Sequence, residues 1–419
     1  MEKYDTAVLK YLFYHPSVRI EQLANSLGIY PEYVINTANN LVEKKYLSNQ
    51  SDLLSLTQYG YLKISTYPFS LLSCLDLTTV TNRFCAITRQ LPYEHPLQYQ
   101  YWFDNITCKK ILEITVDMLS VQRPRLAFIG TPLLSLYFHL AFPDWPITVI
   151  DVSETILNYL KPFFHNNAKI ILADVKSDPV PHDLGRYDAV LIDPPFYADY
   201  YGGFLRWAAS MQDDGGLLFT VLFGTSIKEN NMERKIVMDL ISEQYVFIKS
   251  YDNLLKYLVP RFESQTYDNR HLDGIYISDW RQNTLGVFSK CGVNTSELPY
   301  VDEGKWVEYV FGRKRIMVKK CSCESTNTFV FHPLYDDSPV MKSVSRRNPD
   351  RQAVSLWTSD NEVYTASNSA LQFIHEVLHK IETTQEIEAI AIQDWENKCG
   401  CVEIQTALWK IRNLTEKQD

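Results

Sequence analysis

Short hydrophobic runs alternate with helically spaced hydrophobic residues through the middle of the chain. The runs occupy residues 125–130, 147–151, 168–174, 187–193 and 217–223, and helical spacing fills 135–142, 154–164 and 200–211. Strands that alternate with helices over short connections predict βαβ units, and therefore an α/β, Rossmann-like, doubly wound sheet in a domain over residues 121–290. Strand-like segments at 245–248, 276–278 and 285–288 would complete this sheet.

The N-terminal part shows three short amphipathic segments followed by a hairpin pattern. Helices are predicted at 5–14, 20–27 and 31–45, and the hairpin at 47–56. This order is typical of a winged helix, which we assign to residues 1–66, with a linker and helix over 67–120. The third helix carries Glu32 and Glu43 and little positive charge. It therefore favours a structural or homodimerising role over reading of DNA.

The alternation of strands and helices ends near Gly292. Strand-like patterns at 306–320 and 328–332 and a helical pattern at 369–381 predict an accessory α+β domain over residues 291–419. The sequence Arg346-Arg347-Asn348-Pro349-Asp350-Arg351 is a basic turn that would either contact a phosphate or lie solvated on the surface.

Composition narrows the class of protein. The chain has 419 residues, is 46% hydrophobic and has a net charge of −9, which fits a globular protein and favours a polycationic ligand over nucleic acid. The N-terminus lacks the pattern of a signal peptide, and the chain lacks an apolar run long enough to span a bilayer. We therefore expect a cytoplasmic protein without a membrane partner.

Four residues follow the predicted strands at the edge where α/β sheets bind ligands: Gly130, Asp151, Asp174 and Asp193. The spacing between Gly130 and Asp151 is the one expected for an acidic residue that binds ribose hydroxyls. The Gly130 turn has one glycine only, whereas a pyrophosphate cradle needs several. These positions favour an adenosine cofactor without phosphates, held by Gly130, Asp151 and Asp174.

The fourth strand stops abruptly at Asp193-Pro194-Pro195-Phe196, because consecutive prolines cannot donate hydrogen bonds to a sheet. This places a carboxylate and an aromatic ring at the mouth of the predicted site. The helix that follows is rich in aromatic residues, at Tyr197, Tyr200, Tyr201, Phe204 and Trp207, which would pack in the core or contact a substrate.

With these residues, the segment from about 123 to 224 resembles the class I S-adenosylmethionine-dependent methyltransferase fold. The winged helix, the stretch Pro96-Leu97-Gln98-Tyr99-Gln100 and the Asp-Pro-Pro motif together resemble the branched-chain polyamine synthases, the N4-bis(aminopropyl)spermidine synthase family. That family transfers aminopropyl groups from decarboxylated S-adenosylmethionine to a polyamine nitrogen. Its first motif has Asp residues after the glycine, where this chain has Thr131-Pro132-Leu133. The altered turn, combined with Asp-Pro-Pro-Phe, resembles methyltransferases that act on adenine amino groups.

Either reaction assigns roles to the same residues. A polyamine amine must lose a proton, at a cost of about 4 kcal/mol at pH 7, so Asp193 and Asp199 would hold the cation and orient its nitrogen. On an adenine, Asp193 and the Pro194 carbonyl would accept hydrogens from the amino group while Phe196 stacks on a flipped base. Asp193, Pro194 and Phe196 are the predicted catalytic residues, and Tyr197 and Asp199 the predicted substrate-binding residues.

Two Cys-x-Cys pairs lie in the predicted accessory domain, at Cys321, Cys323, Cys399 and Cys401. They are a candidate four-thiolate zinc site, but their spacing differs from the usual Cys-x-x-Cys knuckle, so ordinary thiols are the expected state and no metal is assigned.

The sequence therefore predicts a transferase that alkylates an amine nitrogen, using S-adenosylmethionine or its decarboxylated form. The larger extent of the polyamine synthase resemblance and the acidic balance favour aminopropyl transfer to a polyamine. Methylation of an adenine-type amino group in RNA or DNA is the first alternative. A catalytically silent winged-helix regulator is the second.

Overall fold

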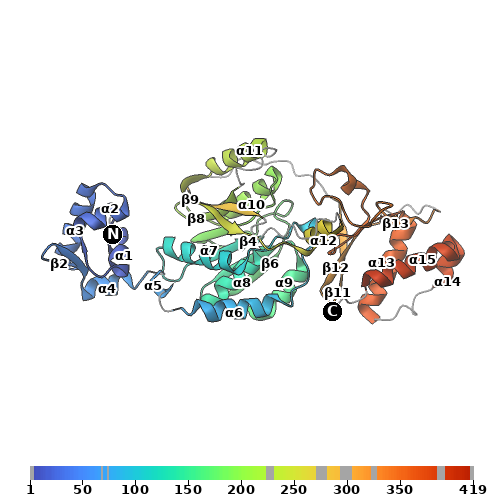
Figure 1. Ribbon diagram of the computed structural model, residues 1–419, viewed down its shortest axis with the longest axis horizontal. Helices are drawn as coiled ribbons and strands as arrows, with labels where there is room; N and C mark the ends of the chain where they lie inside the picture. The colour runs from blue at the N-terminus through green and yellow to red at the C-terminus, as the bar shows by residue number, and fades with distance from the viewer. Residues whose placement is uncertain are drawn as a thin grey trace. The chain divides into compact units, whose positions relative to one another are not determined.

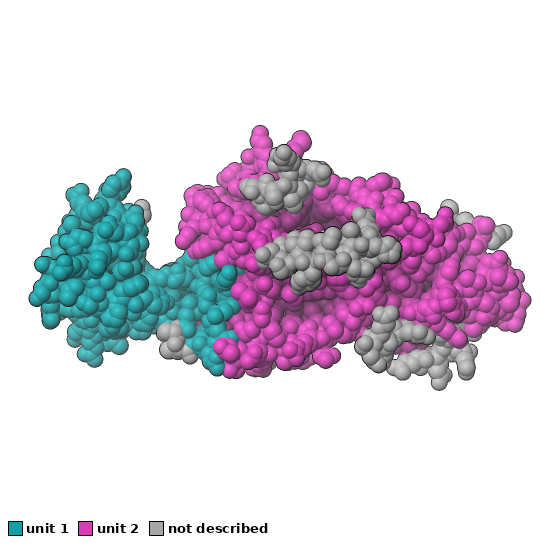
Figure 2. Space-filling model, viewed as in Figure 1, with its two compact units in different colours: residues 1–77, 109–125 teal, residues 78–108, 126–419 magenta. Residues whose placement is uncertain are grey.

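The structure is a computed structural model that describes residues 4–67, 69–72, 75–222, 231–269, 281–292, 304–321, 328–384 and 392–415. Two compact units divide the chain (Figure 2), one of residues 1–77 and 109–125 and one of residues 78–108 and 126–419. The C-terminal region thus belongs to the same unit as the central sheet. None of the described helices is both long and apolar enough to cross a membrane.

The first unit contains the predicted N-terminal helices and hairpin. Its elements are α1 (Asp5–Tyr14), β1 (Val18–Arg19), α2 (Ile20–Leu27), α3 (Pro31–Glu43), β2 (Leu47–Gln50), β3 (Leu53–Leu56), α4 (Gln58–Ile64) and α5 (Phe69–Leu72). The strands form a small antiparallel sheet in the order β1-β3-β2. Helix α3 ends before the predicted residue 45, because Lys45 adopts a left-handed conformation with φ of 61° that starts the turn into β2.

A mixed seven-stranded sheet forms the centre of the second unit (Figure 1), in the order β6-β5-β4-β7-β8-β10-β9. The first five strands in this order, β6-β5-β4-β7-β8, are parallel to their neighbours. Strand β10 runs antiparallel to both β8 and β9. The strands are β4 (Leu126–Ile129), β5 (Ile147–Asp151), β6 (Ala168–Leu172), β7 (Ala189–Ile192), β8 (Leu217–Leu222), β9 (Tyr245–Lys256) and β10 (Gln282–Lys290). This sheet is typical of the methyltransferase fold and confirms the α/β prediction.

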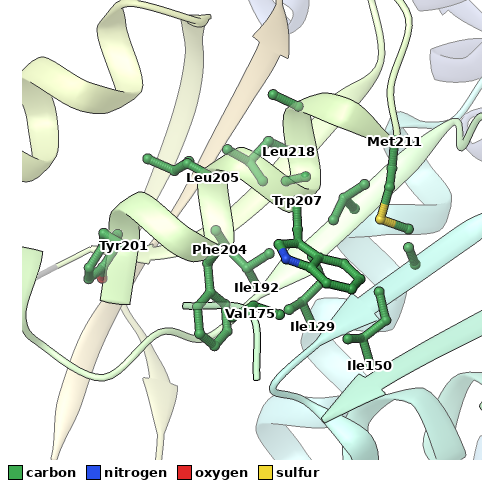
Figure 3. Packing of buried hydrophobic residues seen from close by; sticks show 14 of the residues in the cluster. Ile129, Ile150, Val175, Ile192, Tyr201, Phe204, Leu205, Trp207, Met211 and Leu218 are labelled. Carbon is green, nitrogen blue, oxygen red and sulfur yellow. The ribbon is translucent and has the colours of Figure 1, made fainter. Parts of the chain in front are cut away.

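Four helices pack directly on this sheet: α8 (Pro132–Ala141), α9 (Glu154–Leu160), α10 (Ala198–Ser210) and α11 (Asn231–Ser242). Helix α6 (Leu77–Thr88) contacts α8 and α9, and α12 (Arg261–Asn269) packs with residues of the C-terminal region. Most of α7 (Asn105–Met118) belongs to the first unit. Ile129 of β4 packs in a cluster with α10 and α11 (Figure 3), whereas the neighbouring Phe128 places its ring 5.1 Å from that of Phe138 on α8. Strands buried on both faces explain why their sequences read as continuous hydrophobic runs.

The C-terminal region forms a second, antiparallel sheet in the order β11-β12-β14-β15-β13, with three helices (Figure 1). Its elements are β11 (Trp306–Phe311), β12 (Lys314–Lys319), β13 (Phe331–Pro333), β14 (Leu356–Thr358), β15 (Val363–Ala366), α13 (Asn368–Thr384), α14 (Ile392–Cys399) and α15 (Cys401–Thr415). The predicted strands and the helix are present. The segment predicted as a strand at 276–278 lies outside the described residues.

Tight packing at the end of β4 leaves no room for a side chain at Gly130. Its φ is +67°, and an added Cβ atom would lie 2.8 Å from Cε1 of Phe204 on α10. We predict that Gly130→Ala lowers the free energy of unfolding by about 2–4 kcal/mol, since backbone strain and overpacking add. Urea unfolding measures the change.

Gly215→Ala is the matched control for that substitution. Gly215 has a similar conformation, with φ of +87°, but an added Cβ would contact nothing within 4 Å. It should therefore cost only the strain, about 1 kcal/mol. Equal losses at the two positions would show that contact with Phe204 is not what requires glycine at 130.

Candidate cofactor and acceptor site

A cavity opens at the carboxyl ends of β4, β5, β6 and β7, where the parallel strands meet one edge of the sheet. It is lined by residues 98–102, 129–130, 150–152, 173–175, 193, 195, 200 and 204. Gly130, Asp151, Asp174 and Asp193 are all among them. The structure thus brings together the four residues that follow the predicted strands.

Asp151 ends β5 and is almost fully buried. Its carboxylate accepts a hydrogen bond of 2.8 Å from the backbone N–H of Ser153, whose hydroxyl in turn caps α9 by accepting from the Ile156 N–H. Burial raises the pKa of Asp151 from 3.8 to about 6, although the Ser153 hydrogen bond and the charge of Arg315 favour the ionised form. A carboxylate fixed this way suits a ligand that donates hydrogen bonds, such as a ribose diol.

Asp174 follows β6 and is half-buried. One of its carboxylate oxygens accepts from the backbone N–H of Lys176 at 3.0 Å, and its own N–H donates to Asp178 at 2.8 Å. These bonds close a turn that holds the Asp174 side chain at the cavity wall.

Asp193 follows β7 and is the cavity carboxylate with the most strongly perturbed ionisation. Its Oδ1 accepts a hydrogen bond of 2.9 Å from the hydroxyl of Tyr257. Burial raises the pKa of Asp193 from 3.8 to about 7, although the Tyr257 hydrogen bond and the charge of Arg281 favour ionisation. Perturbed carboxylates in cavities are frequent at functional sites.

The remaining predicted site residues lie beside the cavity, outside its lining. Pro194 is buried, and Phe196 packs half-buried against the core cluster of α10. Tyr197 accepts a hydrogen bond of 3.0 Å from the Arg346 backbone N–H, and Asp199 pairs with the Arg346 guanidinium through two bonds of 2.7 and 2.8 Å. The two predicted substrate-binding residues therefore contact the C-terminal region.

Of the aromatic residues in α10, Tyr201 and Trp207 lie fully buried in the core cluster (Figure 3). Tyr200 and Phe204 belong to that cluster and also line the cavity. Core packing therefore accounts for Tyr201 and Trp207, whereas both alternatives stay open for Tyr200 and Phe204.

Several site residues escaped sequence reasoning because they come from distant segments. Tyr257 follows β9, and Arg315 lies on β12 of the C-terminal region. Arg346 belongs to the basic turn that the sequence indicated, but its pairing with Asp199 was not predicted. Residues 98–100 belong to the stretch that carries the family resemblance, and together with Tyr101 and Trp102 they line the cavity. The concentration of Gln, Tyr and Trp just before a helix was the available indication.

Three buried side-chain atoms beside the cavity have no hydrogen-bond partner among the described residues: Nε2 of Gln100, Nε1 of Trp102 and Oγ1 of Thr131. Gln100 and Trp102 line the cavity, and Thr131 and Trp102 line a small branch of it next to Gly130. Buried polar atoms without partners are costly, so their presence indicates a ligand with polar oxygens or nitrogens. S-adenosylmethionine, with ribose, carboxylate and adenine groups, fits this set.

No cluster of metal-ligating side chains occurs in the part of the chain that the structure describes. Cys321 and Cys399 pack against the core of the C-terminal region, and Cys401 donates to Glu396 on the surface. Cys323 lies outside the described residues. The zinc alternative therefore stays a prediction.

Comparison with known proteins gives one family match. Residues 94–269 match the model of a family described as probable N6-adenine methyltransferase. No curated protein matches the chain.

Solved structures show remote similarity. The branched-chain polyamine synthase from Thermus thermophilus has a TM-score of 0.44 and 11% identity, over 68% of this chain and 86% of that one. The N-methyltransferase NodS from Bradyrhizobium japonicum has a TM-score of 0.33 and 11% identity, over 49% and 97%. Neither similarity is close enough to bear on the reaction.

The family match spans every residue of the cavity, and the strand order and the orphaned donors agree with an S-adenosylmethionine site. The protein is an S-adenosylmethionine-dependent enzyme, and its residues 94–269, less than half of the chain, match a methyltransferase family.

Proposed function

We propose that the protein transfers a methyl group from S-adenosylmethionine to the exocyclic amino group of an adenine-type base in RNA or DNA. The match to the N6-adenine methyltransferase family carries the proposal, because residues 94–269 include the whole cavity lining and the Asp193-Pro194-Pro195-Phe196 loop. The sequence favoured aminopropyl transfer to a polyamine, and the family match supports its first alternative instead.

The contacts of Asp199 also weaken the polyamine interpretation. A polyamine site needs carboxylates that are available to several ammonium groups. The Arg346 guanidinium already neutralises Asp199 through two hydrogen bonds, and the same guanidinium lies 4.2 Å from the Tyr197 ring centre. Because this ion pair has no net charge, Asp199 offers little attraction to a polycation.

Methylation of an adenine amino group does not require the site to deprotonate an ammonium group. The amino group carries no ammonium proton, so the enzyme has to orient the nitrogen and draw electron density toward it. Bound S-adenosylmethionine supplies an electrophilic methyl group. The Asp193 carboxylate and the Pro194 carbonyl would accept hydrogen bonds from the amino group, and Phe196 would stack on the base. As the nitrogen–methyl bond forms, the sulfonium–methyl bond breaks, S-adenosylhomocysteine leaves and the nitrogen loses one proton to solvent. The Tyr257 hydroxyl holds the Asp193 carboxylate in place at 2.9 Å.

The first unit supports a winged-helix assignment, since a hairpin follows the helices α1, α2 and α3. Its α3 has no Lys or Arg, and its exposed residues include Tyr33 and Ile35. A surface of this kind suits contact with protein better than contact with phosphates, so we assign RNA or DNA binding to the catalytic unit.

Asp193→Asn should abolish methyl transfer and leave cofactor binding nearly unchanged. The amide keeps an oxygen for Tyr257 but has no charge to polarise the acceptor amine, so the rate should fall about 100-fold or more. The measurement is N6-methyladenosine, detected by mass spectrometry after RNA or DNA incubated with the enzyme and deuterated S-adenosylmethionine is digested to nucleosides. Binding of S-adenosylhomocysteine by calorimetry should stay within about threefold of wild type.

Asp188→Asn is the control, because Asp188 directly precedes β7 and lies away from the cavity end of that strand. It should retain wild-type activity. Label found on spermidine instead of nucleic acid, or full activity of Asp193→Asn, would refute the proposed function.

The raised pKa of Asp193 also predicts a pH-dependent effect on stability. An acid whose pKa is 3.8 unfolded and about 7 folded destabilises the fold increasingly as the pH rises between these values. Asp193→Asn removes that cost, so its gain in the free energy of unfolding should grow by about 1–2 kcal/mol from pH 5.5 to pH 8.5.

Urea unfolding at the two pH values measures this gain. Asp183→Asn is the control, because Asp183 is exposed and Lys169 lowers its pKa. A gain for Asp193→Asn that stays constant with pH would show that Asp193 ionises normally.

A further inference from the structure

A fully buried arginine of the C-terminal sheet contacts residues that line the cofactor cavity. Arg315 lies on β12 and has no exposed surface. Its Nε donates to the Glu308 carboxylate of β11, and Nη1 donates to the Tyr93 carbonyl at 3.2 Å. Its remaining hydrogen bonds go to the Gln98 side chain, to Gln100 and to Ser153. A buried guanidinium is tolerated only when it is paired in this way, so these contacts fix its position.

Arg315 determines which way the Gln100 amide faces. The Gln100 oxygen accepts from Arg315 Nη1 at 2.5 Å and from the His95 backbone N–H at 3.0 Å. Because both donors require the oxygen, the amide nitrogen must lie on the other side. That nitrogen is buried, and it has no partner among the described residues. Gln100 lines the cavity, so its N–H groups are placed to donate to a ligand.

The same guanidinium supports the acceptor side of the site. Arg315 Nη2 donates to the Ser153 hydroxyl at 3.1 Å, and the Ser153 backbone N–H donates to the Asp151 carboxylate at 2.8 Å. One side chain from the C-terminal sheet therefore holds a donor, Gln100, and an acceptor, Asp151. A ribose diol both donates and accepts hydrogen bonds, so it matches this pair.

We propose that the C-terminal region completes the cofactor site: Arg315 positions Gln100 so that its amide N–H groups donate to the ribose oxygens of S-adenosylmethionine. Gln100 is the binding residue and Arg315 the positioning residue. The inference rests on the proposed function only for the identity of the cofactor and is independent of the methyl acceptor.

Gln100→Glu tests the binding role. Glutamate keeps oxygens for Arg315 and His95 but replaces the N–H donors with an acceptor. Calorimetric affinities for 5′-methylthioadenosine and S-adenosylhomocysteine, which share the adenosine part, should both fall at least about 10-fold. The ribose contact is tested with 2′-deoxy and 3′-deoxy forms of methylthioadenosine. Loss of the contacted hydroxyl should weaken binding to wild type about 10-fold and to Gln100→Glu less than about threefold.

Gln212→Glu is the matched control, because Gln212 is also a buried glutamine but does not line the cavity. Its amide nitrogen donates to the Leu217 carbonyl and its oxygen accepts from the Tyr245 hydroxyl. Its affinity losses should stay below about threefold, with the full deoxy effect retained.

Arg315→Met tests the positioning role by removing the guanidinium while keeping much of its volume. Its affinity loss should not add to that of Gln100→Glu, whereas a merely structural role gives additive losses. Should Arg315→Met fail to fold, the Gln100→Glu and deoxy-ligand measurements still decide the binding role.

Affinity of Gln100→Glu within about threefold of wild type, or equal deoxy effects in both proteins, would overturn the inference. Failure of the wild type to bind either ligand would overturn it together with the cofactor assignment. Normal ligand binding without methylation of nucleic acid would refute only the proposed acceptor.

Discussion

Parallel pairing of β4 with β5 and β7 is the constraint on which the site depends. Ile129 pairs with Ile150 on one side and with Ile192 on the other, so the residues that follow these strands must emerge at one edge. Gly130, Asp151 and Asp193 therefore meet in one cavity although up to 63 residues separate them in the sequence. The absence of a side chain at Gly130 lets α10 pack close to this edge, with Phe204 at its wall. The geometry of the sheet thus determines where the site lies, whichever ligand its side chains bind.

The parts of the site that the sequence predicted are those with local patterns. A buried parallel strand reads as a hydrophobic run, and Asp193-Pro194-Pro195 marks where such a run must stop. Predicting the strands therefore also predicted where Gly130, Asp151, Asp174 and Asp193 lie.

The partners of these residues could not be predicted in the same way. Arg315 binds Gln100 across 215 residues, and Tyr257 binds Asp193 across 64. Arg315 lies in a strand and Tyr257 directly follows one. The hydrophobic pattern of a strand indicates only which of its own residues are buried. For Arg315 the pattern was misleading, because a charged residue in a strand ordinarily indicates a solvent-facing position. Only the folded chain shows that its charge is buried and fully paired.

The contacts of Arg346 change the meaning of an acidic net charge. At −9 the whole chain favours a polycationic ligand, but net charge averages over the surface, whereas recognition depends on charges within about one Debye length, roughly 8 Å. At the Asp193 loop, Arg346 neutralises Asp199. Arg347 lies 5.0 Å from the Tyr197 ring centre and also pairs with Glu233. The local balance of charge is therefore more positive than the composition indicates.

The two cavity carboxylates with raised pKa values support the proposed neutral acceptor in a second way. Burial raises the pKa of both Asp151 and Asp193, which means that the fold pays to keep each of them charged at neutral pH. An ammonium-binding site would relieve that cost with the substrate's own charge, but the cations nearest these residues already belong to the protein, with Arg315 near Asp151 and Arg281 near Asp193. A poorly solvated carboxylate is a strong hydrogen-bond acceptor. Such a carboxylate can polarise a neutral amino group that would be unreactive in water. The proposed methylation of an adenine amino group requires this polarisation.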